Sequence, residues 1–183
     1  MKQRIYKRVA VVIGALLATG VLTGTAAAVL TADAGGAQVR VDKRTGNLPT
    51  STKSTTFVDV PGANVRVSIP PNQSRLYDVP FFAESRCAWP GSGGTCSIRI
   101  IATNLANGAS VELNPVAGLD YAFDSDMAGV IDDRLEGHGM ERSRRLFGGP
   151  NGATYAIRVQ YAVTNPNLVF TLDDWHLAVL TNL

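Results

Sequence analysis

The chain has 183 residues, of which 45% are hydrophobic and 17% are charged, and its formal net charge is +2. This length suits one globular domain with a short appendage, and the composition is that of an ordinary folded chain. Before residue 35 lie four of the 17 basic residues and one of the 15 acidic ones, which leaves 13 basic against 14 acidic residues in the remainder. The remainder is nearly neutral, which argues against a nucleic-acid-binding protein.

Residues 1–34 have the organisation of an export signal. A basic stretch at the start precedes the apolar run Val9–Leu22, and small residues follow. The triplets Ala26–Ala28 and Ala32–Ala34 both fit the small-x-small cleavage rule, and we expect cleavage at the second. An uncleaved membrane anchor is the alternative, because Val9–Leu30 is long enough to cross a bilayer as a helix. The pattern therefore predicts a signal helix and a secreted protein, with a membrane-anchored protein as the second hypothesis.

Residues 35–54 are rich in glycine, threonine, serine and lysine, and Pro49 interrupts them. Such a composition predicts a flexible leader between the signal and the domain. An arm that spans a cell wall or binds a partner is the functional alternative.

From residue 55 onward, short β-prone segments follow one another about every 10 residues, which is typical of a sandwich or barrel. Proline, asparagine and glycine separate them; one such break is Pro61–Asn64, between the first two predicted strands. Residues 134–147 fit either a polar edge strand or a short helix. Gly137 and Gly139 disfavour the helix, and the arginines of this segment suit an exposed edge.

The clearest strand pattern lies in residues 153–183. Apolar side chains occupy every second position from Tyr155 to Val163, and the alternation resumes from Leu168 to Val179 after the turn residues Asn165–Asn167. We predict that these two strands form an antiparallel pair. Because one pair cannot bury an apolar face alone, the upstream strands are expected to form an opposite layer. The predicted fold of residues 55–183 is an all-β, antiparallel β-sandwich of jelly-roll type.

Cys87 and Cys96 are the only cysteines. In an exported chain they predict a disulfide, which would close a short glycine-rich loop. Structural stapling is the expected role. A binding loop that displays Trp89 is the alternative.

Asp124 and Asp126 stand at the first and third positions of a sequence that begins like a calcium loop. The fifth and twelfth positions are Ala128 and Leu135, which have no side-chain oxygen, so an EF-hand is excluded. An irregular calcium site that uses Asp120, Asp124 or Asp126 is the only cofactor hypothesis. A solvated acidic loop is the alternative.

Asp173 and Trp175 share one face of a predicted strand. A tryptophan beside a carboxylate can form a platform for stacking a sugar, whereas a tryptophan in register with Leu177 and Val179 is more typical of a core. Arg142 and Arg144 belong to the main basic cluster. They predict binding of phosphate or an anionic wall polymer, with pairing to neighbouring acidic residues as the alternative.

Four segments, Tyr121–Ser125, His138–Ser143, Arg158–Val163 and Leu172–Leu177, together resemble a family of uncharacterised exported proteins of actinobacteria. The resemblance extends from about Phe57 to the C-terminus and implies secretion and a β-rich domain, without an activity. A looser similarity, at the level of fold alone, is to the jelly-roll modules of the C1q and tumour-necrosis-factor type.

We therefore expect a secreted, non-enzymatic binding or structural module, with cell-wall or extracellular polysaccharide as the candidate partner. A carbohydrate-binding module that uses Trp89 or Trp175 is the first alternative. A secreted hydrolase built around His138 or His176 is the second, although the sequence has neither a Gly-x-Ser-x-Gly elbow nor a His-Glu-x-x-His pair.

Overall fold

The computed structural model of the protein describes residues 36–88, 93–116, 121–126 and 134–183. These residues form ten β-strands and no helix. None of the described residues therefore belongs to a helix that is long and apolar enough to span a bilayer. The expected signal helix, its cleavage sites, Trp89 and Asp120 lie outside the described residues.

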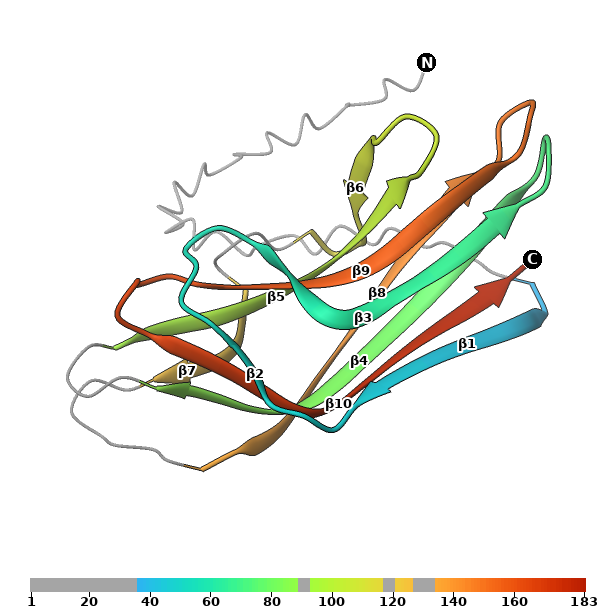
Figure 1. Cartoon of the computed structure of the whole chain (residues 1–183). Coiled ribbons are helices and arrows are strands. Elements are labelled where there is room, and N and C mark those ends of the chain that lie inside the picture. Colours follow the sequence, from blue (N-terminus) through green and yellow to red (C-terminus); the bar gives the residue numbers. More distant parts are fainter. Residues whose placement is uncertain (1–35, 89–92, 117–120, 127–133) are drawn as a thin grey trace, which may run out of the picture. The chain divides into compact units, whose positions relative to one another are not determined.

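The strands form two antiparallel sheets (Figure 1). The first sheet has the order β1-β10-β4-β8, and β2 pairs with β10 beyond the end of β1. Its strands are β1 (Gln38–Gly46), β2 (Thr50–Thr52), β4 (Ser74–Ala88), β8 (Glu136–Phe147) and β10 (Val169–Asn182). The second sheet has the order β3-β9-β5-β6, and β7 also pairs with β5. Its strands are β3 (Val58–Ile69), β5 (Gly94–Asn104), β6 (Ser110–Glu112), β7 (Ala122–Asp126) and β9 (Ala153–Val163).

The strand order is that of a jelly roll. β1 and β2 follow one another along the same strand, β10, and β6 and β7 do the same along β5. When each of these pairs is taken as one broken strand, the sheets read 1-8-3-6 and 2-7-4-5 in chain order. This arrangement of two interlocked Greek keys confirms the predicted all-β, jelly-roll-like sandwich.

β9 and β10 do not pair with each other, so the predicted antiparallel pair at the end of the chain is wrong. β9 lies between β3 and β5 in the second sheet, whereas β10 lies between β1 and β4 in the first. The turn after β9 is closed by a 2.9 Å hydrogen bond from Leu168 N to Asn165 O, and the chain changes sheet there. The alternating pattern identified both strands but does not specify which neighbour each one pairs with.

The predicted flexible leader over residues 35–54 is also wrong, because this range contains β1 and β2. β1 pairs with β10 from Gln38 opposite Asn182 to Gly46 opposite Trp175. A further hydrogen bond of 2.6 Å joins Gly36 N to Leu183 O. These strands satisfy the backbone groups along one side of β10, a requirement that the local composition of the segment cannot reveal.

The predicted turn at Pro61–Asn64 lies inside one long strand. The pairing of β3 with β9 is interrupted between Asp59 and Asn64 and then continues, which makes the segment a bulge rather than a connection between two strands. Gly62 adopts a φ of 78° at this position. The bulge bends β3, so the single strand replaces the two strands that the sequence predicted.

For residues 134–147 the strand alternative is confirmed: β8 forms an edge of the first sheet. Ser143 on this edge exchanges two backbone hydrogen bonds of 2.9 Å with Asn114, which follows β6 at the edge of the second sheet. One side of the sandwich is therefore closed by backbone pairing, which protects an otherwise exposed edge.

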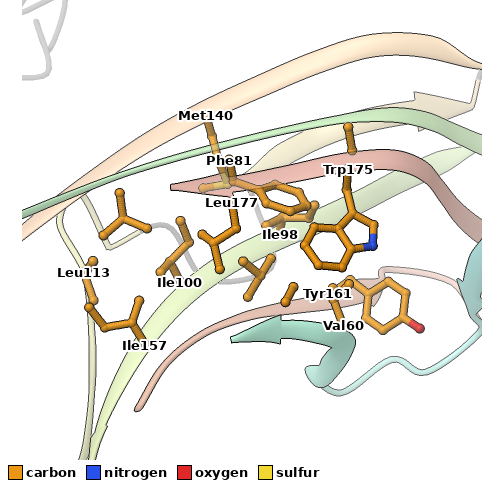
Figure 2. Close-up of a cluster of buried hydrophobic side chains, with 14 of the residues drawn as sticks. Val60, Phe81, Ile98, Ile100, Leu113, Met140, Ile157, Tyr161, Trp175 and Leu177 are labelled. Atoms are coloured by element: carbon orange, nitrogen blue, oxygen red, sulfur yellow. The ribbon is translucent and has the colours of Figure 1, made fainter. Parts of the chain in front are cut away.

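The core fills the space between the two sheets. Figure 2 shows Phe81, Met140, Trp175 and Leu177 of the first sheet close to side chains of the second. The partners labelled in the second sheet are Val60, Ile98, Ile100, Ile157 and Tyr161. All of these side chains are at most 5% exposed, and each contributes about 1.5 to 3 kcal/mol. The alternation of inward and outward side chains predicted this core correctly.

Candidate binding site

The predicted disulfide between Cys87 and Cys96 is present, with a Cα–Cα distance of 5.7 Å. Cys87 lies near the end of β4 and Cys96 near the start of β5, so the bond joins the two sheets. Both side chains belong to the core. A structural disulfide of this kind is typical of proteins in an oxidising, extracellular environment.

Trp175 is a core residue and not an exposed platform. Its side chain is 4% exposed, and its ring centroid lies 6.5 Å from that of Phe81. On its other side, a Cβ atom added to Gly46 would be 2.3 Å from the indole nitrogen, and one added to Gly62 would be 3.5 Å from the ring. Because glycines of β1 and β3 cover the indole so closely, little of the ring is left for a sugar.

Asp173 and Asp174 lie at an irregularity of β10, where the register with β4 shifts between Asp173 and His176. Asp174 has a φ of 43°, and its backbone nitrogen donates a 2.9 Å hydrogen bond to Asp173 Oδ1. The carboxylate of Asp173 is therefore engaged by its own neighbour. The structure does not combine Asp173 with Trp175 into a sugar-binding surface.

Arg142 and Arg144 point inward, on the same side of β8 as the buried Met140 and Leu146. The Arg142 guanidinium lies 4.4 Å from the ring centroid of Tyr121, and this residue is 6% exposed. Arg144 Nη1 donates a 2.9 Å hydrogen bond to the backbone oxygen of Glu112 in the second sheet. The two arginines thus fasten the sheets together, and these inward contacts do not favour binding of a polymer.

Asp124 is joined to residues of two other strands. Ser85 Oγ of β4 donates a 2.7 Å hydrogen bond to Asp124 Oδ2 of β7, and it lies 2.9 Å from Nδ1 of His138 on β8. Ser85 is 1% exposed. The order of the three groups differs from that of a Ser-His-Asp hydrolase, in which the histidine lies between the serine and the carboxylate. A polar cavity of only about 40 Å³ adjoins Ser85 and Asp124.

The calcium hypothesis gains no support from the residues that the structure describes. Within these ranges, no three histidine, cysteine, aspartate or glutamate side chains are grouped as metal ligands. Asp126 is 7% exposed, and Asp124 accepts the hydrogen bond from Ser85.

A larger cavity, of about 260 Å³, lies where the β1 edge of the first sheet meets the β3 edge of the second. Four strands contribute to it. The side chains that carry polar groups are Arg40 and Asp42 from β1, Ser68 from β3, Arg75 and Tyr77 from β4, and Thr181 from β10. Val39, Val67 and Pro70 supply apolar wall. A concave site with a few convergent polar groups and an apolar lining is typical of small-molecule binding.

The charged groups of this cavity make hydrogen bonds and an ion pair. Arg40 and Asp42 form a two-point ion pair, with 2.7 Å between Nε and Oδ2 and 2.8 Å between Nη2 and Oδ1. The hydrogen bond with Asp42 is the main reason why the pKa of Arg40 is raised above its ordinary value. Arg75 Nη1 donates a 2.8 Å hydrogen bond to Ser74 O, and Nη2 donates to the side chain of Gln73. Two guanidinium groups and one carboxylate therefore border the cavity, and each of them makes at least one hydrogen bond.

Tyr77 is 1% exposed, and burial raises the pKa of its hydroxyl from 10.0 to about 12 despite the opposite influence of Arg75 and Arg40. Between these two pH values the unfolded chain binds fewer protons than the folded chain. The contribution of Tyr77 to stability is therefore complete below about pH 10 and is lost as the pH rises toward about 12.

We expect the free energy of unfolding of the wild type, measured with urea, to fall over this pH range by more than that of the variant Tyr77→Phe. Parallel pH dependences would contradict the burial of the hydroxyl.

The sequence analysis missed this cavity because its residues come from four separate strands. Val39-Arg40-Val41-Asp42 does alternate apolar and charged residues, which was a local signal for a strand in the range predicted to be flexible. Nothing in the sequence indicated that β1 and β10 would bring Arg40 and Thr181 opposite each other.

Comparisons with known proteins do not assign the chain. No protein family matches it, and no curated protein matches it. Among solved structures it is similar to dimeric latent PorU from Porphyromonas gingivalis, with 10% sequence identity and a TM-score of 0.31. The similar region covers 83% of this chain and 14% of that chain.

Proposed function

We propose that the protein is an exported, non-enzymatic binding module and that the cavity between β1 and β3 is its ligand site. The observation that carries the proposal is the convergence of two arginines, one aspartate and the buried hydroxyl groups of Tyr77 and Thr181 on a cavity of about 260 Å³. This volume is close to the lower end of the range for small-molecule sites. The site would accept one small molecule or one unit of a polymer.

Two features support export. The chain begins with a basic segment followed by an apolar run, the pattern of a signal peptide. The disulfide that joins the sheets is of a kind that persists mainly outside the reducing cytosol. Cleavage of the signal would release a soluble module; retention of the apolar run would anchor the same module to a membrane.

The geometry of Ser85, His138 and Asp124 supports a binding role over hydrolysis. The Ser85 hydroxyl donates its proton to Asp124, so His138 is not placed to remove it, and Ser85 is 1% exposed beside a cavity of only about 40 Å³. The three side chains link β4, β7 and β8 across the two sheets. Their arrangement suits a structural clasp.

The test is a binding measurement on the exported protein and on the double variant Tyr77→Phe/Thr181→Val, which keeps the shape of the cavity and removes both hydroxyl groups. Soluble fragments of cell-wall and extracellular polysaccharides are titrated by calorimetry. We expect the variant to bind its ligand about 5- to 100-fold more weakly, because each lost hydrogen bond is worth about 0.5 to 1.5 kcal/mol. Equal affinities would place the binding site elsewhere, for instance on the Trp89 loop of the carbohydrate-binding alternative.

A further inference from the structure

Arg75 brings a positive charge to the cavity that no carboxylate balances. Among the described residues, its hydrogen bonds go to the neutral oxygens of Ser74 and Gln73, and no ion pair involves it. The other arginine of the cavity, Arg40, is neutralised by Asp42 at two points. The charges that border the cavity therefore leave an excess of one positive charge, located at Arg75.

Two hydroxyl groups accompany this charge. Tyr77 and Thr181 both line the cavity and are at most 7% exposed. Within the part of the chain that the structure describes, no hydrogen bond engages either hydroxyl, and neither is completely shielded from solvent. Buried hydroxyl groups normally have a partner, so these two are available to a ligand or to water in the cavity.

A guanidinium group without a counter-ion, beside two hydroxyl donors, is a donor set suited to an oxyanion such as a carboxylate or a phosphate. Guanidinium matches the two oxygens of a carboxylate or a phosphate through parallel hydrogen bonds. Hydroxyl groups add neutral donors at the edge of the anion, and Asp42 can accept hydrogen bonds from hydroxyl groups of the ligand.

We propose that the cavity binds a hydroxylated molecule through one carboxylate or phosphate group, with Arg75 as the residue that recognises the charge. This inference rests on the proposed function, because it assigns a ligand class to the same cavity. Two classes of hydroxylated molecule carry such a group: acidic sugars carry a carboxylate, and phosphorylated polyols carry a phosphate. Inward-pointing charges on β1 also protect a sheet edge from pairing, and that role alone is the competing explanation for Arg40 and Asp42.

The experiment is an NMR titration of the exported protein with sodium galacturonate and with glycerol 3-phosphate, each matched by galactose or glycerol at the same ionic strength. We expect the acidic sugar, the phosphorylated polyol or both to shift the amide signals of Arg40, Tyr77 and Thr181, and the neutral probes to leave them unchanged. Added salt should weaken the binding. Whichever anion binds more tightly identifies the source.

Arg75→Gln is expected to weaken binding of that anion by about 10- to 100-fold, because a hydrogen bond to a charged group is worth about 1.5 to 3 kcal/mol. The matched control is Arg66→Gln, which removes the same charge from an exposed position of β3 outside the cavity and should leave the affinity unchanged. Shifts of the same amides with the neutral probes alone would overturn the oxyanion inference and leave the binding module intact. If neither these probes nor the polysaccharide fragments bind at the cavity, the proposed function fails as well, and Arg40 and Asp42 serve only the sheet edge.

Discussion

Replacing Trp175 with alanine is expected to lower the free energy of unfolding by about 3 to 5 kcal/mol, the usual cost of removing a large aromatic side chain from a core. The indole is 4% exposed and fills the space between Phe81 and the two glycines of β1 and β3. Its loss would leave a cavity that the glycine backbones cannot refill. Urea unfolding of the purified protein, followed by circular dichroism, measures the difference.

The control for this prediction is Leu48→Ala, at a position that is 76% exposed near the same edge, and it should change stability by less than about 0.5 kcal/mol. Trp175→Phe keeps an aromatic ring and should lie between the two. A Trp175→Ala variant that kept its stability and lost binding to polysaccharides would contradict the core assignment and restore the sugar-stacking hypothesis.

Removing the disulfide with the double variant Cys87→Ala/Cys96→Ala is expected to lower the free energy of unfolding by about 2.5 to 3 kcal/mol. The cysteines are separated by 9 positions in the sequence, and the cost follows from the freedom that so short a loop regains in the unfolded chain. Because the bond joins β4 to β5, the variant should also open more readily between the two sheets at this end. Hydrogen exchange at the amides of β7, which pairs with β5 beside Cys96, would detect the opening.

Reduction supplies the matched comparison for the disulfide. Dithiothreitol should destabilise the wild type toward the level of the double variant and leave the variant itself unchanged. Equal stability of the oxidised wild type and the variant would contradict this prediction. It would show that the hydrogen bonds of Ser85 with Asp124 and His138 are enough to hold this end of the two sheets together without the disulfide.

For Ile157 and Leu177, the pattern of the sequence predicted the buried side correctly, because inward and outward positions alternate along any half-buried strand. The disulfide was predicted because only two cysteines were available. The same pattern failed for the pairing of β9 and β10, since a turn between two strands permits either a hairpin within one sheet or a crossing to the other.

The candidate site was beyond prediction for a related reason. Arg75 and Tyr77 are near Arg40 only because β10 lies between β1 and β4, and the residues that fix this order are separated by most of the chain. The residues singled out as binding candidates were chosen for their chemistry. Of these, Arg142, Arg144 and Trp175 turned out to be held in the packing of the sandwich, and Asp173 bonds its own neighbour.

The sequence by itself determined that the chain forms short strands with one apolar face and that its two cysteines bond in an all-β sandwich, because side-chain alternation and cysteine count are local properties. Only the tertiary structure decided that residues 38–46 close the sheet beside β10, and that Arg40, Asp42, Arg75, Tyr77 and Thr181 share one cavity. The physical reason is that the backbone hydrogen bonds between two strands have the same form whichever side chains the strands carry. The order of the strands is therefore set by the packing of the whole core and not by any one segment.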